Sequence, residues 1–196
     1  MRKLIVSEFV TLDGVMEAPG GEPGHPHSGW VFDFVSPEQE QYKLQEVLDA
    51  DALLLGRVTY EGFSAAWPER GGPFADKMND MPKYVVSTTL EDPEWSNTSV
   101  MRDVNEVAGL KEQEGGPILL AGSRTLVHGL MELGLVDEFR LMTFPVVLGS
   151  GARLFPETPD KTQLELVGTQ AFDSGVAVHT YRTRLAREDA GADVRA

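Results

Sequence analysis

The sequence of 196 residues contains no cysteine, which excludes disulfides, thiolate metal sites and a cysteine nucleophile. Basic side chains are scarce as well, with 17 against 31 acidic ones, so the formal net charge is −14. A chain of this charge is poorly suited to the phosphate backbone of nucleic acid or to an anionic membrane surface, and we expect neither partner. No apolar run reaches the roughly 18–20 residues that a membrane helix needs, and no secretory signal is evident. We therefore expect a cytoplasmic protein.

Several motifs that identify common enzyme classes are also missing. The sequence has no Walker A motif, no G-x-G-x-x-G after its first predicted strand and no G-x-S-x-G nucleophile elbow. His25 and His27 flank a proline in a Gly- and Pro-rich loop over 18–29, which makes a preformed metal site improbable, and we expect no metal. His128 and His179 fall in a predicted helix and a predicted strand, where we expect structural roles.

The hydrophobic residues, 41% of the chain, suffice for the core of a single domain. We predict that this domain covers residues 1–184 and that the polar segment 185–196 is a disordered tail. Short apolar runs predict strands, and amphipathic stretches predict helices between them. The predicted strands lie at 4–10, 51–56, 83–88, 98–101, 118–122 and 136–147, with a closing hairpin over 164–171 and 176–184. One predicted helix begins at residue 37. The other predicted helices cover 59–66, 103–114 and 123–133.

The order of these segments predicts the fold class. Strands that alternate with helices over the first two thirds of the chain favour a mainly parallel sheet with helices on both faces. The closing hairpin adds antiparallel strands at one edge of that sheet. We therefore expect one α/β domain with about eight strands. In the helix that begins at Pro37, Ser36 is the expected N-cap, and Tyr42, Leu44, Val47 and Leu48 form the expected apolar face.

Small, hydroxylic or basic residues follow three of the predicted parallel strands. Glycine lets a ligand approach the backbone, hydroxyls bond phosphate oxygens, and arginine offers a planar fork for phosphate. Because the carboxyl ends of parallel strands share one edge of a sheet, these residues could jointly hold a dinucleotide. Each group taken alone could equally consist of ordinary turn and capping residues. The residues concerned are Gly56, Arg57 and Thr59, then Ser87 and Thr88, and then Gly122, Ser123, Arg124 and Thr125.

The order of the motifs resembles the dihydrofolate reductase-like family. The likeness covers roughly residues 2–184 and rests on TLDG at 11–14, LLLGRVTYEGF at 53–63, KYVVSTTL at 83–90, ILLAGSRTLVHG at 118–129 and PVVLGSGARLF at 145–155. Within that family, the chain is most similar to the reductase domain of bifunctional riboflavin-biosynthesis deaminase-reductases and their stand-alone relatives. The resemblance implies a dihydrofolate reductase-like fold and an NADPH-dependent oxidoreductase that transfers a hydride to a pyrimidine, a pterin or a related heterocycle.

The resemblance also implies roles for the residues at the strand ends. It places Gly56, Arg57 and Thr59 near the phosphates on the adenosine side, and Ser87 and Thr88 at the 2′-phosphate. It places the turn of residues 122–125 around the pyrophosphate, and Gly14 and Val15 beside the nicotinamide.

The substrate side of the resemblance is less well defined. Folate reductases carry a carboxylate early in their first helix, but that position falls on Gln39 by one count and on Glu40 by another. The candidate catalytic acids are therefore Asp33, Glu38 and Glu40. Asp13, Trp30 and Phe34 are candidates for binding a flat heterocycle, although Trp30 and Phe34 could instead belong to the core.

Two further hypotheses follow from the same residues. The uncertain acid leaves open a nucleotide- or heterocycle-binding protein that has kept the fold and lost turnover. Relatives of the riboflavin-type reductases look dimeric, so the resemblance implies a homodimer. Its interface could use Phe139, Leu141, Thr143 and the segment 144–146, unless these residues face the core of a single chain.

Overall fold

The computed structural model describes residues 1–157 and 161–183. The predicted tail, 185–196, therefore lies outside the described residues. The strands are β1 (Leu4–Thr11), β2 (Ala52–Gly56), β3 (Lys83–Val86), β4 (Thr98–Met101), β5 (Ile118–Leu120), β6 (Glu138–Phe144), β7 (Leu164–Ala171) and β8 (Ala177–Thr183). The helices are the 3-10 helix η1 (Trp30–Phe34) and the α-helices α1 (Pro37–Asp49), α2 (Arg57–Ala66), α3 (Pro73–Asp80), α4 (Glu106–Glu112) and α5 (Arg124–Glu132).

All eight strands form one sheet in the order β4-β3-β2-β5-β1-β6-β8-β7. The strands from β4 to β6 are parallel to one another, and β8 and β7 run antiparallel at one end. This confirms the predicted mainly parallel sheet of eight strands with an antiparallel carboxyl-terminal edge. The bounds of β4 agree with the predicted strand at 98–101, and those of β7 with the first strand of the predicted hairpin.

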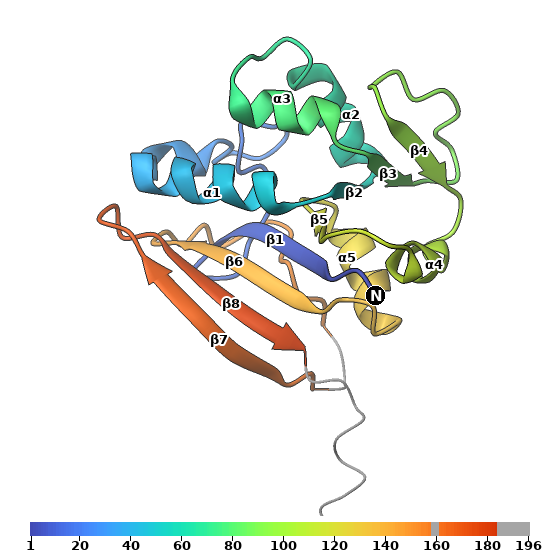
Figure 1. Ribbon diagram of the computed structural model, residues 1–196. Helices are drawn as coiled ribbons and strands as arrows, with labels where there is room; N and C mark the ends of the chain where they lie inside the picture. The colour runs from blue at the N-terminus through green and yellow to red at the C-terminus, as the bar shows by residue number, and fades with distance from the viewer. Residues whose placement is uncertain (158–160, 184–196) are drawn as a thin grey trace, which may run out of the picture.

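Helices cover both faces of the parallel part of the sheet, with α1, α2 and α3 on one face and α4 and α5 on the other (Figure 1). Alternate residues of a strand point to opposite faces, so each strand feeds two cores. Ile5 and Leu53 pack with the first group of helices, whereas Leu4 and Leu54 pack with the second. The hairpin of β7 and β8 extends beyond the helical layers (Figure 1).

The helix α1 begins as predicted, with Pro37 in its first turn and Ser36 accepting a hydrogen bond from the Gln39 N–H at 3.4 Å. The predicted apolar face is wrong in part. Val47 is buried, but Leu48 is 43% exposed, while the polar residues Gln39 and Glu46 of the same helix are buried. The reason is that Glu46 of α1 accepts a hydrogen bond from Ser7 of β1, and the hydropathy of the sequence does not indicate such a polar contact.

The structure also contains helices that the sequence pattern did not predict. The helix α3 has eight residues, of which only Ala75 and Met78 are buried. Two buried positions are too few to give the periodic apolar pattern by which a helix is predicted from sequence. Pro73 in its first turn and Gly72 as its N-cap mark its start. The helix η1 directly follows the predicted loop over 18–29, in a segment for which we predicted no element. The predicted helix over 103–114 is shorter in the structure, at Glu106–Glu112.

The position of β6 fits the alternative that Phe139, Leu141 and Phe144, three of the suggested interface residues, face the core of a single chain. This strand lies inside the sheet between β1 and β8, and Phe139, Leu141 and Phe144 are at most 8% exposed within a single chain. These side chains form the core of the monomer and are not available to a second copy. Within the described residues, no helix is both long enough and apolar enough to cross a membrane. The same part of the chain holds no group of three or more His, Asp or Glu side chains placed to bind a metal ion.

Candidate functional site

The turns that follow β2 and β5 are in direct contact, because these two strands are neighbours in the sheet. The Ser123 hydroxyl accepts a hydrogen bond from the Gly56 N–H at 2.7 Å and donates one to the Thr59 hydroxyl, also at 2.7 Å. A Cβ atom at Gly122, where φ is +66°, would lie 2.8 Å from the Thr59 side chain. A Cβ atom at Gly56 would lie 2.9 Å from the Ser123 hydroxyl oxygen. The structure thus brings four of the predicted cofactor residues together and explains both glycines by close packing.

The two helices that start at these turns present unpaired N–H groups. Neither α2 nor α5 has a side-chain cap, because the Ser123 hydroxyl is turned to Thr59 and the N-cap of α2 is Gly56. Neither has an acidic residue in its first turn, whereas α1, α3 and α4 each have one or more. Instead, α2 begins at Arg57 and α5 at Arg124, cations placed where the helix dipole favours an anion. The pair of helix starts is therefore suited to bind a phosphate group.

The end of β3, next to β2, carries Ser87. Its hydroxyl accepts the N–H groups of Thr89 at 3.2 Å and of Leu90 at 2.9 Å, and its carbonyl accepts from the Arg102 guanidinium at 3.1 Å. Ser87 is buried and Thr88 is exposed. Both residues therefore lie at the same carboxyl edge as the turns of β2 and β5, but the Ser87 hydroxyl already serves to shape the turn.

Asp13 follows β1 and holds two loops together. Its carboxylate accepts hydrogen bonds from the Thr11 hydroxyl at 2.6 Å, the Gly149 N–H at 2.8 Å and the Leu148 N–H at 3.3 Å. The hydrogen bond from Thr11, helped by these N–H groups, lowers the pKa of Asp13 from its ordinary value. Asp13 thus has an anchoring role, and its predicted contact with a substrate stays a prediction.

The two residues expected beside the nicotinamide follow Asp13. Gly14 has a φ of +80°, and Val15 is fully buried and pairs with Arg153 as an isolated antiparallel bridge. The Arg153 side chain donates a hydrogen bond to the Asp13 carbonyl at 2.9 Å. These contacts place the turn of residues 11–14 at the carboxyl end of β1.

Glu8, in the middle of β1, is a polar residue that our sequence analysis did not select. It is 6% exposed, and its Oε1 atom is buried and has no hydrogen-bond partner among residues 1–157 and 161–183. Desolvation raises the pKa of Glu8 well above its ordinary value, opposed by the Gly122 N–H and by the charge of Lys43 and reinforced by the charge of Glu46. The signal that could have found it is a carboxylate inside the apolar run LIVSEFV, where a charge is costly.

Trp30 and Phe34 lie against a third core cluster. Trp30 is 4% exposed, its indole N–H donates to the Glu17 carbonyl at 2.8 Å, and its ring meets the edge of Phe144 at 5.2 Å between centroids. Phe34 contacts the same Phe144 ring at 6.0 Å. Their packing fits the core alternative for both residues, and their role in substrate binding stays a prediction.

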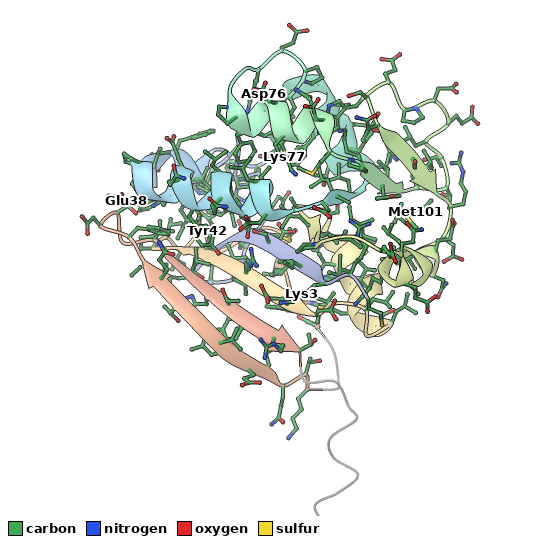
Figure 2. All side chains as sticks on the ribbon, in the orientation of Figure 1. Lys3, Glu38, Tyr42, Asp76, Lys77 and Met101 are labelled. Carbon is green, nitrogen blue, oxygen red and sulfur yellow. The ribbon has the colours of Figure 1, made fainter. Side chains whose placement is uncertain are left out.

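The candidate acids are separate from this cluster. Asp33, Glu38 and Glu40 are all exposed. Glu38 lies at the outer end of α1 (Figure 2). It lines a surface pocket together with Tyr42 of the same helix and Gln170 of β7. Gln39, the alternative position for a carboxylate, is buried and donates a hydrogen bond to the Ser174 hydroxyl.

The buried polar groups of α1 lie two turns further along the helix. Ser7 of β1 donates a hydrogen bond to Glu46 at 2.7 Å and accepts one from Lys43 at 2.8 Å, and Lys43 and Glu46 also form an ion pair. Arg140 of β6 lies 3.5 Å from the second carboxylate oxygen of Glu46. This network fixes α1 on the sheet, on the face opposite to α5.

Comparison with known protein families identifies the family to which the chain belongs. The model of the RibD C-terminal domain matches residues 2–178. The chain belongs to the RibD C-terminal domain family. It is 32% identical over 193 residues to the uncharacterized protein YyaP of Bacillus subtilis (strain 168), covering 92% of this chain and 94% of that protein. It is 31% identical over 186 residues to the uncharacterized protein YwjB of the same strain, covering 92% and 98%.

Solved structures show the same fold. A protein from Shewanella sp. PV-4 assigned to riboflavin biosynthesis superposes with a TM-score of 0.68 at 18% identity, covering 93% of this chain and 99% of that one. Dihydrofolate reductase from Enterococcus faecalis, solved with NADP(H) and RAB-propyl, superposes with a TM-score of 0.61 at 20% identity, covering 92% and 96%. The RibD C-terminal domain described here therefore has the dihydrofolate reductase-like fold that the sequence motifs predicted.

Proposed function

We propose that this protein is an NADPH-dependent reductase that transfers a hydride to a small nitrogen heterocycle, such as a pyrimidine or a pterin. The observation that carries the proposal is the pair of adjacent helix starts at α2 and α5. Both lack a side-chain cap and an acidic first turn, and both begin with arginine. A bound diphosphate would satisfy their N–H groups and offset the repulsion between each arginine and its helix dipole.

The order of the strands suggests how a dinucleotide would lie. The carboxyl ends of β3, β2, β5 and β1 are consecutive, and three gaps between strands span about 14 Å. With the diphosphate at α2 and α5, Arg57 and the turn at Ser87 would contact the adenosine end. The nicotinamide end would then lie at β1. Family membership and the neighbouring dihydrofolate reductase, which was solved with NADP(H), support this arrangement.

The chemistry asks little of the protein beyond binding and orientation. When bound, NADPH would supply a hydride, with its electron pair, to a carbon of a C=N bond and would itself become NADP⁺, while the adjacent nitrogen takes a proton. The chain would hold the two partners in register and exclude water from between them. The proton would come from solvent water, either directly or through one of the candidate acids Asp33, Glu38 and Glu40. These three side chains can be tested one by one.

The experiment that tests the proposal is a binding titration followed by fluorescence of the tryptophans or by calorimetry. We expect NADPH to bind more tightly than NADH. Arg57→Ala should weaken NADPH by about ten-fold, because a charge-assisted contact to phosphate is lost. Among the described residues Arg57 pairs with the exposed Glu61 alone, at 2.7 Å, so thermal stability should change little.

The matched control is Glu61→Gln, which removes the partner of Arg57 but keeps the cation. This variant should bind NADPH as tightly as the parent or more tightly. Absence of binding of either nucleotide to the parent protein would refute the proposal.

A nucleotide- or heterocycle-binding protein without turnover is the second candidate. It is favoured by two observations, the exposure of all three candidate acids and the presence of Gln39 at the alternative position. The discriminating measurement is NADPH oxidation in the presence of a panel of pterins, folates, flavin precursors and nitro compounds. Binding without oxidation by any member of the panel would favour this second function.

A further inference from the structure

The connections that leave the neighbouring strands β1 and β5 run toward opposite ends of the sheet. The connection from β1 passes through α1 to β2 on one side, whereas the connection from β5 passes through α5 to β6 on the other. The two crossing helices lie on opposite faces of the sheet. In open α/β sheets, ligands bind outside the carboxyl ends of the strands at such a switch point.

Glu8 lies at this switch point. Val6 of β1 is the partner of Leu120 of β5, so two residues further along the same parallel register Glu8 lies beside Gly122. Gly122 belongs to the turn that starts α5, and its backbone N–H is close enough to the Glu8 carboxyl to lower the pKa of that group against the effect of burial. The carboxyl is therefore next to the end of β5 where the proposed diphosphate site begins.

The Glu8 carboxyl has an unused hydrogen-bonding atom at this place. Its Oε1 atom is buried without a partner, in a residue that is 94% buried, since only 6% of its surface is exposed. Such an atom costs free energy unless a ligand or a proton satisfies it. Glu138, a second buried glutamate in the sheet, differs because Lys3 and Arg140 occupy its carboxylate.

We propose that Glu8, as a neutral carboxylic acid, binds the carboxamide of the nicotinamide ring. The acid would donate its O–H to the carboxamide oxygen and accept a hydrogen bond from the carboxamide N–H₂, since a carboxylic acid carries one donor and one acceptor side by side. This inference rests on the proposed function, which puts the nicotinamide end of the dinucleotide at β1. Burial keeps the acid in the neutral form that this pairing needs.

The test compares Glu8→Leu and Glu8→Gln with the parent protein. Three ligands are titrated: NADPH, its 3-acetylpyridine analogue, in which a methyl ketone replaces the carboxamide, and 2′,5′-ADP, which has no nicotinamide. The parent should bind NADPH about ten-fold more tightly than the analogue. Glu8→Leu should lose this preference, Glu8→Gln should keep it because its amide also has a donor and an acceptor, and all three proteins should bind 2′,5′-ADP equally.

Controls separate this role from a structural one. Glu8→Leu should have a higher thermal midpoint than the parent, because it removes a buried polar group without a partner. Glu138→Gln, at the amino end of β6 and so at the opposite edge of the sheet, should leave the binding of all three ligands unchanged. A loss of the preference in Glu138→Gln as well would show a general effect of buried carboxylates and would overturn the inference.

The remaining outcomes distinguish the two proposals. If Glu8→Leu binds NADPH as the parent does and keeps the preference over the analogue, the role of Glu8 is wrong and the reductase proposal stands. If the parent binds neither NADPH nor 2′,5′-ADP, the proposed function fails and the inference fails with it.

Discussion

The hydroxyl of Ser123 donates a 2.7 Å hydrogen bond to the hydroxyl of Thr59, although these residues are 64 positions apart in the sequence. Ser123 is the N-cap of α5 and Thr59 lies in the first turn of α2, so this bond joins the two helix starts. With the Gly56 N–H as its second partner, Ser123 sets the spacing between the two groups of N–H donors that we propose bind a diphosphate.

Ser123→Ala should therefore affect both stability and binding. It leaves the Gly56 N–H and the Thr59 hydroxyl without their partner, which should lower the free energy of unfolding by about 1–3 kcal/mol. NADPH should bind several-fold more weakly, because the two helix starts lose their fixed spacing. Thr59→Val is the matched control, since it keeps the bond from Gly56 and should have the smaller effect in both measurements. Urea unfolding and calorimetric titration check this, and equal effects of the two variants would contradict it.

Gly122→Ala should destabilise the fold. The residue has a φ of +66°, and an added Cβ would meet the Thr59 side chain at 2.8 Å, so we expect a loss of about 1–3 kcal/mol in the free energy of unfolding. Gly62→Ala gives the contrast, because Gly62 lies inside α2 with nothing within 4 Å of an added Cβ. That variant should gain about 0.5–1 kcal/mol. Thermal or urea unfolding measures both effects. A change of stability in the same direction in the two variants would disprove this account.

Asp13 should make stability depend on acid pH. Its pKa is lowered in the folded state by the Thr11 hydroxyl and by the Gly149 and Leu148 N–H groups. The unfolded chain therefore binds a proton first, and the stabilisation is present above the ordinary aspartate pKa of about 4 and is lost as the pH falls below it. Asp13→Asn should lower stability at pH 7 by about 0.5–1 kcal/mol, since these contacts are partly open to solvent, and should flatten this acid limb. Unfolding measured from pH 3 to pH 7 tests the prediction, and an unchanged acid limb in the variant would contradict it.

The homodimer that the sequence resemblance implies stays a prediction, and the structure offers it a different surface from the one first considered. The strand β7 is the last strand of the sheet, and its Leu166 and Val167 are 54% and 41% exposed. An exposed apolar edge strand can pair with a second copy. We expect sedimentation to show a dimer that Leu166→Lys dissociates and that Leu133→Lys, at the end of α5, leaves intact. A monomeric parent protein would refute this prediction.

The sequence by itself determined the order and kind of most elements, because inner strands such as β2 and β5 are short apolar runs that are buried on both faces of the sheet. It also determined that small, hydroxylic and basic residues follow β2, β3 and β5. Only the tertiary structure decided which of these residues touch, since the contact of Ser123 with Thr59 depends on β5 lying beside β2. It also decided that β6 is an inner strand and that Glu8 has no partner for one carboxylate oxygen. Local patterns report burial along one segment, whereas hydrogen-bond partners are set by packing between segments that are distant in the chain.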